Sequence, residues 1–404
     1  MIIKNCNIID CTGRAPYKAT VKVTDGLITD IITDCANTID DDTVIDARDK
    51  YLMPGLINSH VHINRRHVSR ANGAFRNLGP TVENSTDGRR MMYAAKNAWY
   101  ELNQGITSIR DLCSVGRSAS ELKAAFEDGI IRGPRLVVCG KAIACTGGHE
   151  THMYKGAVEV DGPDAVMQAV RNEIRLGADF IKLMACGGIA GMPEHENPDM
   201  VELTEEEIRA ACTAAHDHNK KVTVHAYGIK PVMNSLRGGV DGIEHGVNLN
   251  DEALDIMCEH SVYYVPTMTT VTGFIDKERS VGHDELADLI TKEVMIKHFE
   301  SVSRAHEKGI LIAAGSDTLG ELHKEMYLLE EMGLNRMEVL QTATINAAKV
   351  LQMDNKIGTL EVGKEADLLL LGSNPLDNLH NLNDVKEVYC RGEHVTYEWM
   401  LNLQ

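Results

Sequence analysis

Short apolar runs alternate with helix-forming segments through the centre of the chain, from about residue 56 to about residue 352. The runs are GLINSHVHI, TSIRDL, RLVVCGKAI, FIKLMA, KVTVHAYG, GIEHGV, VYYVPTM and ILIAAGSDT. Between them lie segments with helical periodicity, and Thr204 and Glu207 have the spacing of a capping box. Eight strands that alternate with helices predict an α/β fold, a (β/α)8 TIM barrel. The competing fold is a doubly wound open sheet, but no G-x-G-x-x-G motif follows the first strand.

Both ends of the chain are typical of short β-strands. Residues 1–51 alternate apolar and polar positions in runs separated by turns such as Asp25-Gly26, and the last fifty residues contain ADLLLLG and VKEVYCRGEHV. Neither end is long enough to cover a sheet face alone. We therefore predict a composite β-sandwich domain from residues 1–55 and 355–404, with the barrel domain, residues 56–354, inserted between them.

Net charge and cysteine usage limit which binding partners and which cellular compartment we expect for the protein. A formal net charge of -18 argues against nucleic acid or an anionic membrane as a partner, because phosphate would be repelled. The ten cysteines are scattered without a C-x-x-C pair, which suits a reducing compartment. The first residues are strand-like, unlike a signal peptide, and no apolar run reaches the length of a membrane span. We expect a cytoplasmic protein.

Residues that can bind metal recur at the ends of the predicted strands. They are His60, His62, Lys182, His225, His245 and Asp317. A barrel carries its chemistry at the carboxyl ends of its strands, and imidazole and carboxylate groups are common ligands of divalent metals. The set therefore suggests a hydrolytic site with two metals.

The histidines also have a structural interpretation. An H-x-H pair such as His60 and His62 is by itself more often surface or core, but the preceding YLMPGLINS supplies a turn and an apolar strand that lead it into the barrel mouth. A single strand-end histidine is likewise more often a core residue. His225 and His245 close successive strands, which favours coordination. Strand alternation predicts that Glu244 faces away from the barrel interior.

Lys182 interrupts the apolar run FIKLMA. A buried lysine is costly unless it is paired or deprotonated. Reaction with CO2 would convert the amine into a carboxylate able to bridge two metals, whereas the alternative is a lysine that reaches out to solvent. The neighbouring histidines favour the bridging ligand. Asp317 can bind metal and accept a proton, or it can cap the helix that follows.

These motifs resemble the amidohydrolase superfamily of the binuclear, carboxylated-lysine type. The similarity covers nearly the whole chain and includes MPGLINSHVH, FIKLMACGG, VTVHAYG, GIEHGV, GSDT and ATINAAKVLQMDNKIGTLEVGKEADLLLL. Within the superfamily, CTGGHE, DGPDAVMQAVRNEIRLGADFIKLMACGG and the tyrosine of HAYG are most similar to dipeptidases and carboxypeptidases of the prolidase and Xaa-Arg/Lys type, with imidazolonepropionase as a related kind.

The resemblance implies a role for each ligand. His60, His62 and Asp317 would hold one metal, His225 and His245 would hold the other, and carboxylated Lys182 would bridge them. Zinc suits these ligands best, although manganese, cobalt or iron can substitute. A hydroxide that bridges the metals would attack the substrate. Asp317 would take its proton and return it to the leaving amine.

The resemblance also implies the substrate contacts. Tyr227 would stabilise the oxyanion, unless it is an ordinary buried aromatic residue. His149 resembles the family histidine that binds the substrate α-carboxylate, with His152 as a competing candidate. Arg65 and Arg66 can also meet an anionic group.

The predicted function is a metal-dependent hydrolase that cleaves the amide bond of dipeptides or N-acyl amino acids, of the Xaa-Pro or Xaa-Arg/Lys type. Glu194, Glu196 and Asp199, in the loop after Lys182, are candidates to select a basic side chain. The alternatives are a hydrolase of cyclic amides, esters, carbamates or phosphotriesters on the same site, and a scaffold without metals, which the six filled ligand positions disfavour. Relatives of this kind are commonly homo-oligomers.

Overall fold

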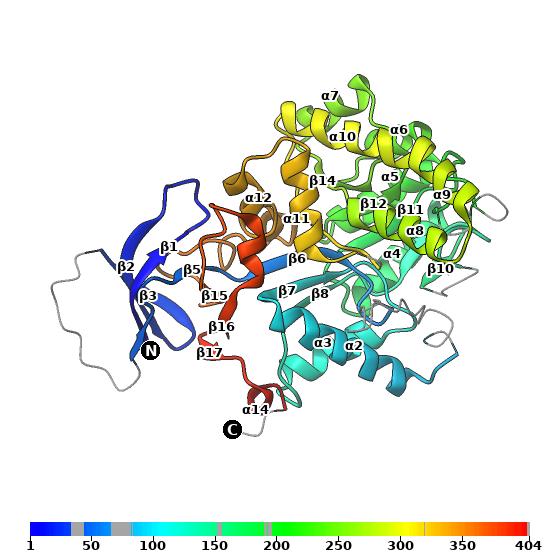
Figure 1. The fold of residues 1–404 in the computed structure, drawn as a ribbon. Coiled ribbons are helices and arrows are strands. Elements are labelled where there is room, and N and C mark those ends of the chain that lie inside the picture. Colours follow the sequence, from blue (N-terminus) through cyan, green and yellow to red (C-terminus); the bar gives the residue numbers. More distant parts are fainter. Residues whose placement is uncertain are drawn as a thin grey trace.

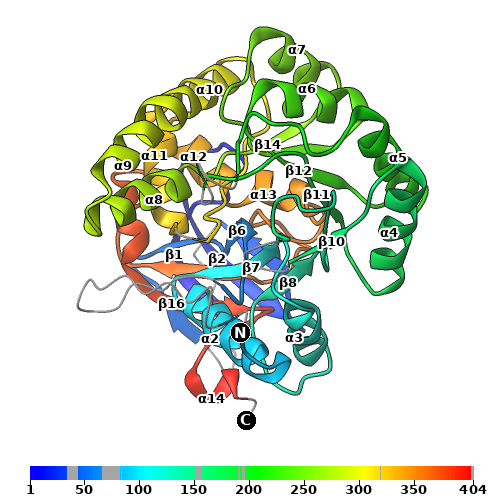
Figure 2. The same ribbon diagram turned by 90° about the vertical axis from the view of Figure 1, so that its right-hand side faces the viewer.

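The computed structural model describes residues 1–33, 44–65, 82, 84–151, 156–189, 192, 196–318 and 320–401. One sheet lies at one end of the molecule, and helices curve around the parallel strands of the rest (Figures 1 and 2). This is the mixed α/β architecture that the alternating runs predict. Among the described residues, no helix combines the length and apolar character needed to cross a membrane.

An eight-stranded sheet is built from both ends of the chain. Its order is β17 (Glu393–His394), β16 (Val385–Cys390), β15 (Leu368–Leu371), β5 (Tyr51–Pro54), β1 (Ile2–Ile8), β2 (Tyr17–Thr24) and β3 (Leu27–Ile32), with β4 (Val44–Asp46) beside β1. The two ends meet where β5 pairs with β15 antiparallel, so that Leu52 lies opposite Leu370. The sandwich form and the domain boundaries stay predictions.

The remaining strands form two parallel sheets. The larger has the order β10 (Ala157–Glu159), β9 (Ala142–Ala144), β11 (Ile181–Met184), β12 (Val222–Ala226), β13 (Gly242–His245) and β14 (Tyr263–Val265). The smaller contains β6 (Leu56–Val61), β7 (Ile106–Asp111) and β8 (Arg135–Val138). Two predicted strands differ from expectation. RLVVCGKAI is split between β8 and β9, and Ile312 alone of the last run makes a β-bridge, to Tyr264.

Helices lie between the parallel strands in the sequence and continue after them. They are α2 (Asp87–Asn103), α3 (Ser118–Glu127), α4 (Pro163–Arg175), α5 (Glu205–His216), α6 (Ile229–Gly238), α7 (Asp251–Glu259), α8 (Met268–Ser280), α9 (Asp284–Ile290), the π-helix η1 (Thr291–Met295), α10 (Ile296–Glu307), α11 (Leu322–Glu331), α12 (Arg336–Thr342), α13 (Ile345–Val350), the 3-10 helix η2 (Leu379–Asn383) and α14 (Tyr397–Met400). The predicted capping box at Thr204 and Glu207 is confirmed at the start of α5.

Strand alternation separates the core from the polar side chains. Leu183, Val224 and Ile243 are paired in register across β11, β12 and β13, and all three are buried in the main hydrophobic core. Lys182 and Thr223, one position earlier on their strands, are paired on the opposite face. The sheet therefore directs its apolar side chains to the core and its polar ones to a common space.

Candidate active site

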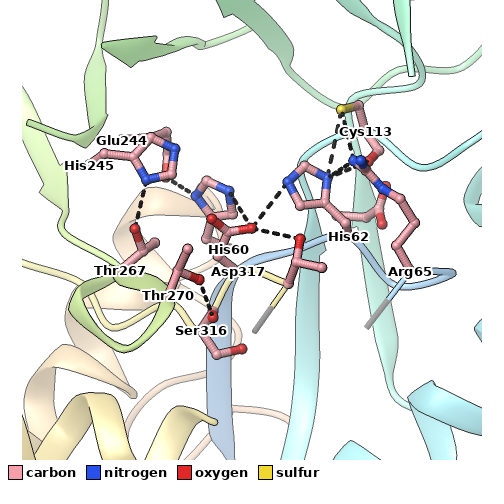
Figure 3. A network of polar contacts seen from close by, with 12 residues as sticks. His60, His62, Arg65, Cys113, Glu244, His245, Thr267, Thr270, Ser316 and Asp317 are labelled. Carbon is pink, nitrogen blue, oxygen red and sulfur yellow. Dashed lines mark hydrogen bonds and ion pairs between the residues drawn. The ribbon is translucent and has the colours of Figure 1, made fainter. Parts of the chain in front are cut away.

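The carboxylate of Asp317 lies against the two histidines at the end of β6. The carbonyl oxygen of His60 accepts hydrogen bonds from the backbone N–H groups of Ser316 and Asp317, at 3.1 and 2.7 Å, which ties this loop to β6. Oδ1 of Asp317 is then 3.3 Å from Nε2 of His62 and 4.0 Å from Nε2 of His60 (Figure 3). Burial raises the pKa of Asp317, but the histidines outweigh it and hold this pKa well below its usual value.

Two further histidines complete the cluster. His60, His245 and Asp317 each offer a ligand atom, and these atoms lie within 4.8 Å of one another. The ring of His225 is edge-on to that of His245, with their centroids 4.6 Å apart. Burial lowers the pKa of both His225 and His245 well below the usual value, which keeps them in the neutral form that binds metal. The cluster thus brings His245 close to His60 and Asp317, whereas the sequence resemblance groups it with His225.

Lys182 is buried on β11. Its Nζ atom has no hydrogen-bond partner among the described residues, and the same holds for Nε2 of His60. Burial lowers the pKa of Lys182, which favours the neutral amine, the form that reacts with CO2. Buried polar atoms without partners are costly, and a bound metal ion would complete both groups. The residues present therefore fit a metal centre.

His149 and Tyr227 flank the cluster. The ring of His149 stacks on that of His225 at 4.2 Å, and its Nδ1 lies 2.7 Å from Oε1 of Glu196. Burial lowers the pKa of His149, but Glu196 and its acidic neighbours more than offset this and raise it overall. Tyr227 stacks on His245 at 4.9 Å and lies 5.0 Å from His225, so it does project to the same side as His225.

Arg65 is paired within the protein. It is buried, with Nη1 2.8 Å from Oε2 of Glu150 and Nη2 donating to the carbonyl oxygen of Cys113 at 3.2 Å. Its contact with substrate stays a prediction. Asp199 is exposed in the loop after β11. His152, Arg66 and Glu194 lie outside the described residues.

The expectation that Glu244 faces away from the interior is wrong. Glu244 is paired with His225 in the parallel sheet and faces the same side, where its Oε2 lies 2.7 Å from Nδ1 of His60. His245 reaches the same space because its φ is +71°, outside strand geometry, so alternation fails between the two residues. Arg110, which also contacts Glu244, was missed, although it interrupts the run TSIRDL as Lys182 interrupts its own strand.

Comparison with known proteins identifies the family. The model of the amidohydrolase family matches residues 51–395. The chain belongs to the amidohydrolase family. Ochratoxinase of Aspergillus niger is 29% identical over 384 residues, which cover 86% of this chain and 74% of that protein. A 5-methylthioadenosine/S-adenosylhomocysteine deaminase of Halalkalibacterium halodurans is 22% identical over 411 residues, 92% of this chain and 84% of that protein.

Solved structures agree with this assignment. A Xaa-Pro dipeptidase with methionine bound in its active site is 29% identical, with a TM-score of 0.85 over 98% of this chain and 99% of the other. A prolidase in complex with N-methylphosphonate-L-proline is also 29% identical, with a TM-score of 0.86 over the same shares. This amidohydrolase is therefore a hydrolase, and divalent metal ions are the general cofactors of its family.

A pocket of about 210 Å³ opens beside the cluster of this amidohydrolase. Its lining residues come from the loops after β11, β12 and β13 and from the η1–α10 region: Met192, Asn197, Pro198, Asp199, Tyr227, Gly228, Val247, Asn248, Glu293, Val294 and Lys297. Tyr227 belongs to this wall and also stacks on His245 of the cluster. Nζ of Lys297 lies 2.9 Å from Glu293, so the charge of this acid is largely compensated.

Proposed function

We propose that this amidohydrolase cleaves the amide bond of dipeptides or N-acyl amino acids that carry a free α-carboxylate. The observation that carries the proposal is the stacking of His149 on His225. It holds a histidine with a raised pKa directly against the ligand cluster. Nδ1 of His149 is engaged by Glu196, while Nε2 is 3.9 Å from the nearest oxygen of Glu150, beyond hydrogen-bond distance. The Nε2–H group is therefore the donor for the substrate carboxylate.

The proposed cofactors are two divalent ions, which we assign as zinc, with Lys182 carboxylated by CO2. The residues that would hold them are His60, His62, Lys182, His225, His245 and Asp317. When bound, such ions polarise a carbonyl group and lower the pKa of a water molecule. The unpartnered Lys182 Nζ and His60 Nε2 atoms support this assignment.

The other steps fall to side chains of the protein. Asp317, whose pKa is low, is ionised and can accept the proton of the attacking water and pass it to the leaving amine. Tyr227 keeps its own proton because burial raises its pKa well above the usual value, so its hydroxyl can donate to the developing oxyanion. His149 binds the carboxylate and fixes the scissile bond between these groups.

The pocket beside Tyr227 is the proposed site for a substrate side chain. Asp199 and Glu293 are the acids that the described part of the pocket wall contains, whereas Glu196 contacts His149. Pairing with Lys297 compensates Glu293, and Met192 and Val247 add apolar surface. The lining thus suits a long side chain with a cationic end, while the solved prolidases support the Xaa-Pro type, and the experiment below includes both.

We infer that the parallel strands close into one (β/α)8 barrel, and that residues 1–55 and 355–404 form the composite domain. Closure is supported on one side by the N–H groups of Ala313 and Ser59, which donate to Tyr264 and Ala314 at 2.9 and 3.0 Å. On the other side, the N–H of Asp179 donates to Val138 at 2.8 Å, between β8 and β11. Homo-oligomerisation and a cytoplasmic location belong to the same proposal.

The test is release of amino acid from a panel of dipeptides and N-acyl amino acids. The protein is loaded with zinc in the presence of bicarbonate, and each substrate is compared with its C-terminal amide. Cleavage that is lost on amidation is the expected result. Equal cleavage of acid and amide would overturn the role of the carboxylate. No cleavage of any member would overturn the peptidase proposal and favour lactams, esters, carbamates or phosphotriesters.

A further inference from the structure

Glu244 is the centre of a buried hydrogen-bond network next to the ligand cluster. Its Oε2 lies 2.7 Å from Nδ1 of His60. A dashed line marks this contact in Figure 3. Its Oε1 accepts hydrogen bonds from Nη1 of Arg110 at 2.8 Å and from Oγ1 of Thr223 at 2.6 Å. All four side chains are buried, so water does not compete for these contacts.

Arg110 is itself fixed from several sides. Nη1 also donates to the carbonyl oxygen of Ser59 at 3.2 Å, Nη2 donates to the hydroxyl of Tyr263 at 2.9 Å, and the guanidinium lies 4.2 Å from the ring centre of Phe180. Glu244 is therefore paired with a guanidinium group that is itself held in place on several sides.

The network determines which nitrogen of His60 is available to a ligand. A carboxylate only accepts hydrogen bonds, so Nδ1 of His60 carries the hydrogen and Nε2 carries the lone pair. Nε2 is the atom that lies 4.0 Å from Oδ1 of Asp317 and has no hydrogen-bond partner among the residues described. Glu244 thus presents the lone pair of His60 to the ligand cluster.

We infer that Glu244 is a positioning residue that fixes the tautomer and orientation of His60 for metal binding. The inference rests on the proposed metal-dependent function. A carboxylate that holds the second nitrogen of a ligating histidine commonly changes metal affinity about 10- to 100-fold. Sequence alternation concealed this role, because it predicted that Glu244 points away from the site.

Glutamine is a suitable substitution because it keeps the size of Glu244. It replaces one of the two acceptor oxygens of the carboxylate with an NH2 group, which donates. With its amide oxygen toward Arg110 and Thr223, the NH2 group would face Nδ1 of His60 and favour the wrong tautomer. With the amide reversed, the NH2 group would face the donors of Arg110 and Thr223. Either arrangement opposes the native network.

The test is zinc affinity, measured by competition with a chromophoric chelator. Glu244→Gln is expected to lower the affinity about 10- to 100-fold. The matched control is Glu173→Gln, because Glu173 is also a buried carboxylate paired with an arginine, Arg117, at 2.8 Å, but lies on α4 without contact to a ligand histidine. The control is expected to lose stability and keep wild-type zinc affinity.

A second variant covers the case in which Glu244→Gln does not fold. Glu244→Asp keeps the charge beside Arg110 but withdraws the carboxylate from His60, and it too is expected to bind zinc more weakly. The absorption spectrum of the cobalt-substituted protein should change in both variants and stay unchanged in Glu173→Gln, since it reports the ligand geometry.

The outcomes separate this inference from the proposed function. Equal zinc affinity in the wild-type protein and both Glu244 variants would overturn the role of Glu244 alone. Weaker binding by the variants, in a protein that cleaves no amide of the panel, would support the role of Glu244 and overturn the proposed substrate class. No zinc binding by the wild-type protein would overturn both.

Discussion

The imidazole ring of His149 stacks on that of His225, with the ring centroids 4.2 Å apart. A residue from the loop after β9 is thereby held against a residue of β12, and Glu196 fixes its other side through Nδ1. The stacked pair consists of a proposed substrate contact, His149, and a proposed metal ligand, His225. Because the two roles belong to different side chains, substitution of one residue can test substrate binding separately from metal binding.

His149→Gln is expected to raise KM for substrates with a free carboxylate about tenfold or more, because a charged hydrogen bond to the substrate is lost. Steady-state kinetics on an acid substrate provide the measurement, and competitive inhibition by its C-terminal amide provides the comparison. Inhibition by the amide should respond little to the substitution, since the amide does not use the cation. An equal change for acid and amide would exclude this role.

Asp317→Asn is expected to lower kcat about 10²-fold or more, because an amide cannot accept the proton of the attacking water. Zinc content and circular dichroism are measured on the same sample to show that the variant is folded and loaded. A folded, zinc-loaded variant with near-normal turnover would rule out Asp317 as the proton carrier.

Lys182→Ala is expected to reduce the bound metal below two ions per chain, since the bridging group is removed. Elemental analysis after dialysis measures the metal content. Lys123→Ala is the control, because Lys123 lies on α3 and pairs with Asp179 instead of facing the proposed metal ligands. Two ions retained in Lys182→Ala would contradict carboxylation of this lysine.

Tyr227→Phe is expected to lower kcat about 10²-fold with little change in KM, because the hydroxyl acts mainly on the oxyanion of the transition state. The stacking on His245 should survive, since phenylalanine keeps the ring. An unchanged kcat would make Tyr227 a structural residue only.

Glu325 provides a prediction for stability. It is buried and accepts the backbone N–H groups of Met268 and Thr269 at 3.0 and 2.8 Å, and burial raises its pKa from 4.5 to about 7. The folded state then holds a proton that the unfolded state releases, so stability falls between pH 4.5 and about pH 7, by at most about 1.4 kcal/mol per pH unit.

Denaturant unfolding of wild type and Glu325→Gln across this range measures the effect of Glu325. The variant cannot titrate at this position, so its stability should fall less steeply between these pH values. Parallel curves for the two proteins would show that Glu325 has the same pKa in the folded and unfolded states.

The sequence was informative at several positions where a polar residue ends an apolar strand. His225, His245 and Asp317 stand out for this reason, and the structure brings them together with His60. The side to which Glu244 points was not predictable, because the positive φ of His245 depends on the folded backbone.

Pairing partners were equally hidden from the sequence. Arg65, a candidate substrate contact, pairs in the fold with Glu150, which is distant in the chain. Glu196, one of three candidates to select a basic side chain, contacts His149. The pairing of residues that are distant in the chain depends on tertiary contacts, which local sequence patterns do not predict.

The pairing of β5 with β15 has a consequence for synthesis of the chain. Leu52 leaves the ribosome long before Leu370, so the nascent chain carries an open β5 edge while the whole region of parallel strands is translated. Open strand edges attract foreign strands. We therefore expect this edge to need protection, by a chaperone or by rapid packing of the emerging helices, until β15 is synthesised.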